Sequence, residues 1–196
     1  MEGCVARMKI NLTTALPDTL LRETLVLGFF SDELPPKGFC GLVDWRLNGA
    51  ISAQIVDRRI TGAYLEKAAC LIPGRIPVQR ILLFGLGDLC GLTYDKLYNA
   101  GHEMAHAVSG MGTTDLALPM PAAGRGHLPL SGMTEALITG VLEAWVHQPP
   151  QLPVTALEIP GRDEQGDEIR LGVDRARRRV AGAAVEIEGH GTPLEE

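Results

Sequence analysis

Residues 78–111, VQRILLFGLGDLCGLTYDKLYNAGHEMAHAVSGM, decide the fold. Residues 81–84 are an unbroken apolar run, which is typical of a parallel strand that is covered on both faces of an α/β sheet. Gly85 and Gly87 allow a tight turn after this strand, and Thr93 is a good N-cap for the amphipathic helix that follows. The segment therefore predicts a strand–turn–helix unit with 81–84 as the central strand. Ligands gather at the carboxyl ends of such strands.

Strands alternate with helices along the rest of the chain. Apolar or alternating runs predict the further strands, and amphipathic spacing predicts the further helices. We expect strands at 8–13, 25–30, 68–72, 115–119, 154–159 and 183–187, and helices at 42–58 (bent near Asn48-Gly49), 133–146 and 167–179. The alternation predicts the α/β class with helices on both faces of the sheet. It predicts a single domain, residues 1–187, followed by a polar tail, 188–196.

The composition excludes several classes of protein. With 45% hydrophobic and 21% charged residues, the 196-residue chain is typical of a soluble globular domain. No apolar run reaches the roughly 20 residues that a membrane span needs, and the N-terminus, MEGCVARMK, lacks the apolar run of a signal peptide. A net charge of −6 argues against nucleic-acid binding. The dispersed Cys4, Cys40, Cys70 and Cys90 form no C-x-x-C pair, which indicates reduced thiols and a cytoplasmic location.

Three short motifs occur in a characteristic order: G-A-I-S at 49–52, G-L-G at 85–87 and E-A-x-x-x-G-x-x-x-A at 135–144. Their order and spacing within residues 8–180 resemble the amino-terminal domain of the leucyl aminopeptidase family. The resemblance implies a macro-domain-like, three-layer α/β/α fold with a mixed, mostly parallel central sheet. It also implies a role in assembly, because in that family the domain helps to build oligomers and shapes access to the active site.

The chemistry of that family belongs to a second, larger domain, whose two-metal site includes an N-T-D-A-E-G-R segment and a Lys. This sequence contains no N-T-D-A-E-G-R segment. We therefore expect a non-catalytic binding or assembly module, with no cofactor and no aminopeptidase activity of its own. The expected partners are further copies of the chain or a separate peptidase-like chain.

Residues 102–106, HEMAH, are a literal H-E-x-x-H, the pattern in which two His bind zinc and the Glu activates a water. Helical periodicity instead places His102 and His106 far from the apolar stripe of their helix, on its solvent face. We therefore interpret them as surface histidines. A zinc hydrolase that uses His102, Glu103 and His106, with His127 or Glu135 as a third ligand, is the less favoured alternative.

Gly85, Gly87 and Asp88 are the candidate ligand-binding residues, because they follow the 81–84 strand. The segment GLGDLCG misses G-x-G-x-x-G by one residue, so we interpret it as a turn that needs Gly for positive φ and can hold a small anion. The alternative function is a macro-type ADP-ribose- or nucleotide-binding protein or hydrolase. Against it, residues 39–44, FCGLVD, lack the N-A-A-N segment of macro domains.

Other charged residues suggest no chemistry. Asp32-Glu33 and Asp163-Glu164 lie in expected loops with no evident partner, and we assign them no catalysis. The arginines in 175–179 are interpreted as a solvated helix end that complements the helix dipole.

Overall fold

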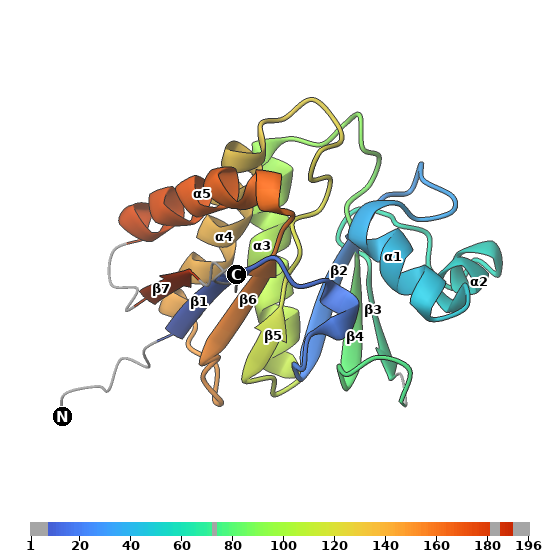
Figure 1. Cartoon of the computed structure of the whole chain (residues 1–196), viewed down its shortest axis with the longest axis horizontal. Helices are drawn as coiled ribbons and strands as arrows, with labels where there is room; N and C mark the ends of the chain where they lie inside the picture. Colours follow the sequence, from blue (N-terminus) through green and yellow to red (C-terminus); the bar gives the residue numbers. More distant parts are fainter. Residues whose placement is uncertain (1–7, 72–73, 181–184, 190–196) are drawn as a thin grey trace, which may run out of the picture.

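Seven strands form one sheet in the part of the chain that the computed structural model describes, residues 8–71, 74–180 and 185–189 (Figure 1). They are β1 (Met8–Thr13), β2 (Thr24–Phe29), β3 (Lys67–Leu71), β4 (Arg80–Gly85), β5 (Asp115–Ala117), β6 (Ala156–Pro160) and β7 (Val185–Gly189). Their order across the sheet is β3-β4-β2-β5-β6-β1-β7. All neighbouring strands run parallel except β3, which is antiparallel to β4.

Helices cover both faces of this sheet. They are α1 (Gly38–Arg46), α2 (Ala50–Val56), α3 (Tyr94–Gly110), α4 (Leu130–His147) and α5 (Gly166–Arg179), with two 3-10 turns, η1 (Pro17–Thr19) and η2 (Asp163–Gln165). An apolar cluster joins α1 and α2 to one face of β2 and β4, and a larger cluster joins α3, α4 and α5 to the opposite face. The predicted three-layer α/β/α fold with a mixed, mostly parallel sheet is therefore confirmed. None of the described helices is long and apolar enough to cross a membrane.

Strand β4 has the burial that its apolar sequence predicts. Ile81 and Leu83 belong to the cluster under α1 and α2, whereas Leu82 and Phe84 belong to the cluster under α3 and α4. All four side chains are at most 2% exposed. The prediction that this strand is central is wrong, because β4 lies second from the edge and β5 lies in the middle. An apolar run reports that both faces are covered, and it carries no information on which strands lie on either side.

Helices α3 and α4 approach each other closely because each carries a glycine at the contact. A Cβ placed on Gly101 of α3 would lie 2.1 Å from the carbonyl oxygen of Leu137. A Cβ on Gly140 of α4 would lie 2.0 Å from the carbonyl oxygen of Tyr98. Gly140 is the glycine of the 135–144 motif, so this part of the resemblance has a packing reason.

The observed boundaries differ from the predicted ones by a few residues. Thr93 caps α3 as expected, since its hydroxyl accepts a hydrogen bond from the Lys96 N–H at 3.2 Å. The predicted bend at 48–49 separates α1 from α2, and α1 begins at Gly38 rather than at residue 42. The predicted tail begins too early, because β7 extends to Gly189, and residues 190–196 lie outside the described residues.

Candidate functional site

Two cavities among the described residues lie where parallel strands end. The smaller one, about 20 Å³, lies between the end of β2, the first turn of α1 and the loop after β5. The larger one, about 170 Å³, lies at the ends of β1 and β6, beside the first turn of α5. The loops that follow β4 and β5 rise at this same edge, at the top of the view in Figure 1. The edge at which the sequence predicts ligands therefore contains space, although little of it.

The glycine turn after β4 uses its backbone donors inside the protein. Gly87 has a φ of +74°, which confirms that the turn needs a residue that tolerates positive φ. The N–H groups of Gly85, Leu86 and Gly87 donate to carbonyl oxygens of the loop before β3 and of β2, at 2.8–3.0 Å. The Asp88 carboxylate accepts the N–H of Gly91 at 2.8 Å. The proposed role of Gly85, Gly87 and Asp88 as ligand-binding residues stays a prediction, and their observed contacts are those of a structural turn.

The smaller cavity has a basic lining that the sequence interpretation missed. Lys37, Arg125 and Arg162 line it together with the first turn of α1. Each of these cations follows the carboxyl end of a predicted strand, in the loops after 25–30, 115–119 and 154–159. This shared position is the sequence signal that would have pointed to them, because the carboxyl ends of parallel strands meet at one edge.

Glu33 is the acidic residue beside this basic lining. It is only 7% exposed and forms an ion pair with Arg125 across 92 residues of sequence. The expectation that Glu33 has no partner is therefore wrong. The guanidinium of Arg125 also lies over the Phe30 ring, 5.6 Å from its centroid. These contacts join the loop after β2 to the loop after β5.

Cys40 lies in the first turn of α1, where helix position alone would favour a reactive thiolate. Its side chain is 3% exposed, and burial raises its pKa from 9.0 to about 12, with a further contribution from the negative charge of Asp44. The Asp44 carboxylate is engaged at the start of α2, where it accepts hydrogen bonds from the backbone N–H groups of Ile51 and Ser52. Cys40 is therefore a neutral core thiol and a poor nucleophile.

The HEMAH segment lies on α3, as predicted, away from both cavities. His102 and His106 are half-buried rather than fully solvated, and their rings lie 4.7 Å apart, edge to face. Glu103 forms an ion pair with Lys67 of β3 at 2.6 Å, and this hydrogen bond lowers the pKa of the Glu103 carboxyl. A carboxylate stabilised in this way is a weak general base.

Of the two candidate third zinc ligands, Glu135 is engaged in ion pairs and His127 lies in a loop. Glu135 pairs with Arg175 at 3.8 Å and with Arg179 at 3.1 Å, both on α5. His127 lies exposed in the loop before α4. Across the described ranges, no three His, Cys, Asp or Glu side chains lie close enough together to hold a metal ion. The arrangement thus offers little support for a zinc site, which stays the less favoured prediction.

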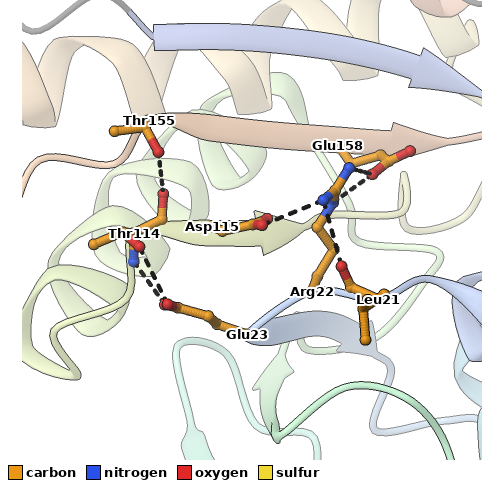
Figure 2. A network of polar contacts seen from close by, with 7 residues as sticks. All are labelled: Leu21, Arg22, Glu23, Thr114, Asp115, Thr155 and Glu158. Atoms are coloured by element: carbon orange, nitrogen blue, oxygen red, sulfur yellow. Dashed lines mark hydrogen bonds and ion pairs between the residues drawn. The ribbon is translucent and has the colours of Figure 1, made fainter.

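A polar network ties the amino ends of β2, β5 and β6 together, at the edge opposite the cavities. Figure 2 shows the Arg22 guanidinium between the carboxylates of Asp115 and Glu158. Glu23 accepts the N–H of Thr114 at 2.9 Å. Burial raises the pKa of Asp115 even though Arg22 opposes this shift. The network joins the segment before β2 to β5 and β6, because Arg22 pairs with a carboxylate from each of these two strands.

Comparison with known proteins agrees with this geometry. Residues 26–145 match the family described as "Cytosol aminopeptidase family, N-terminal domain". A "Probable cytosol aminopeptidase" from Synechocystis sp. is 27% identical over 95% of this chain, and the match spans 39% of that relative's length. A tomato leucine aminopeptidase mutant superimposes with a TM-score of 0.68 at 18% identity, over 90% of this chain and 37% of its own. An Oceanobacillus iheyensis macrodomain with MES bound gives a TM-score of 0.69 at 9% identity, over 86% of this chain and 92% of its own. The resemblance drawn from the motifs is confirmed.

Proposed function

Because this chain belongs to the cytosol aminopeptidase family and matches its N-terminal domain, we propose that it is a non-catalytic assembly module of a peptidase. The observation that carries the proposal is the family match, which runs from β2 to α4 and so includes the close α3–α4 contact. A cytoplasmic location is part of the proposal, because the curated relatives are named cytosol aminopeptidases.

An exposed apolar surface supports an assembly role. Leu21 is 78% exposed, Trp45 is 68% exposed and Leu16 is 42% exposed. Leu16 and Leu21 flank η1, and η1 is joined to α1, which carries Trp45, by the ion pair between Asp18 and Arg46 at 2.6 Å. Large apolar side chains that gather on a surface mark interaction sites more often than singly scattered ones do. We call Leu16, Leu21 and Trp45 the η1–α1 surface.

The test measures assembly. The purified chain is examined by light scattering over a wide concentration range, alone and mixed with the catalytic portion of a cytosol aminopeptidase. We expect either an oligomer of the 21.0 kDa chain or a complex with the catalytic portion. The double variant Leu21→Ser/Trp45→Ser should weaken whichever assembly forms, whereas Leu171→Ser, at a 44% exposed position on α5, should not. A chain that stays monomeric and binds no catalytic portion at any concentration contradicts the proposal.

Absence of peptidase activity is the second part of this proposal. We expect no cleavage of aminoacyl chromogenic substrates by the chain alone, even with added manganese or cobalt, because the N-T-D-A-E-G-R segment is missing from the sequence. Reproducible turnover by a clean preparation would refute it.

The macro-type alternative is favoured by the fold alone. These two cavities, of about 20 and 170 Å³, are each smaller than the usual ligand pocket of about 300–1,000 Å³, so neither by itself supports binding of a whole nucleotide. Titration with ADP-ribose distinguishes the two functions, because saturable binding at micromolar concentration would support the alternative.

A further inference from the structure

The smaller cavity concentrates positive charge. Lys37, Arg125 and Arg162 line it from three different loops, and no carboxylate is among its lining residues. The first turn of α1 also lines it, and no side chain caps that turn. The free N–H groups of a first turn carry partial positive charge. Glu33 compensates only one of the three cations, because its carboxylate pairs with Arg125.

Arg125 carries an unused donor at this place. Its Nε is buried and has no hydrogen-bond partner. Its guanidinium lies against the start of α1, since a Cβ placed on Gly38 would lie 3.1 Å from Arg125 Nη2. A cation at the amino end of a helix is electrostatically unfavourable, and so is a buried donor without a partner. Both features would be relieved by a negatively charged acceptor in the cavity.

We propose that this cavity binds the terminal oxyanion, a phosphate or a carboxylate, of a small organic anion. About 20 Å³ accommodates roughly one oxygen-sized group, so one oxyanion oxygen enters and meets Arg125 and the first turn of α1. Arg162 also lines the larger cavity of about 170 Å³, which gives the body of the ligand a place beside the oxyanion. Oxyanions suit this lining because charge-assisted hydrogen bonds are about twice as strong as neutral ones. The proposal goes beyond the assembly role and does not depend on it.

The test uses inorganic phosphate and acetate as separate probes. Each is titrated into the full chain at constant pH and ionic strength, and amide NMR shifts are followed at Phe39, Cys40 and Ala123, which line the cavity. We expect saturable shifts at these amides. The probe that binds more tightly distinguishes a phosphate-bearing ligand from a carboxylate-bearing one, and either outcome supports the proposal.

Matched variants locate the binding. Lys37→Met and Arg162→Met remove exposed cations of the cavity and should each weaken binding about tenfold or more. Arg75→Met alters an exposed loop before β4 and should bind as the parent chain does. The proposal is overturned if shifts do not saturate, if Lys37→Met and Arg162→Met bind normally, or if all three variants lose binding alike. Amide spectra of each variant confirm that it is folded.

Discussion

Replacing Gly140 with Ala should destabilise the protein, although the same change usually stabilises a helix. Within a helix interior Ala is favoured over Gly by about 1 kcal/mol. Here the new Cβ would lie 2.0 Å from the Tyr98 carbonyl oxygen and 3.0 Å from the His102 nitrogen. Both are backbone atoms of α3, so no side-chain rotation can relieve the contact and the two helices must separate. Overpacking costs about 1–3 kcal/mol or more, and we expect the upper part of this range to prevail over the helix preference.

The expected net loss is about 1–2 kcal/mol, which corresponds to a fall in Tm of about 2–8 °C for a chain of this size. Gly110→Ala is the matched control, because Gly110 is on α3 and its Cβ would meet nothing within 4 Å. Thermal and denaturant unfolding of the two variants should therefore move in opposite directions, or leave Gly110→Ala unchanged. A Gly140→Ala protein that melts at or above the parent temperature would refute the close α3–α4 contact.

Further predictions concern the core, the HEMAH segment and the thiols. Leu82→Ala should lower the free energy of unfolding by about 2–5 kcal/mol in denaturant titrations, because the side chain is 2% exposed in β4. A loss below about 1 kcal/mol would contradict its burial in the cluster under α3 and α4. Changing His102 and His106 together to Gln should cost only about 0.5 kcal/mol, and metal analysis of the parent chain should find no stoichiometric zinc. One zinc per chain that disappears with either His would restore the zinc hypothesis. A thiol reagent at pH 8 should modify the exposed Cys90 in the native state and reach Cys40 only on unfolding, because burial raises the pKa of Cys40 to about 12. Peptide mass spectrometry identifies the labelled thiols. Labelling of Cys40 in the native state would show that α1 opens.

Local features of the chain could be predicted because their causes are local. The apolar residues 81–84 predict a strand that is buried on both faces, and all four side chains are buried. Thr93 predicts the start of a helix, since its hydroxyl satisfies a donor only three residues away. Gly87 predicts a turn with positive φ, because other residues tolerate that conformation poorly. In each case the physical reason acts within a few residues and is visible in the sequence.

The order of the strands and the lining of the smaller cavity depended on tertiary structure. β4 lies beside the antiparallel β3 and not at the centre, since hydrophobicity records burial and not the identity of neighbours. The partner of Glu33 is 92 residues away, and Lys37, Arg125 and Arg162 meet only because β2, β5 and β6 end side by side. The sequence by itself determined which segments are strands, turns and helices. The strand order decided which charges face one another, because charges interact over ångströms in space, whatever their separation along the chain.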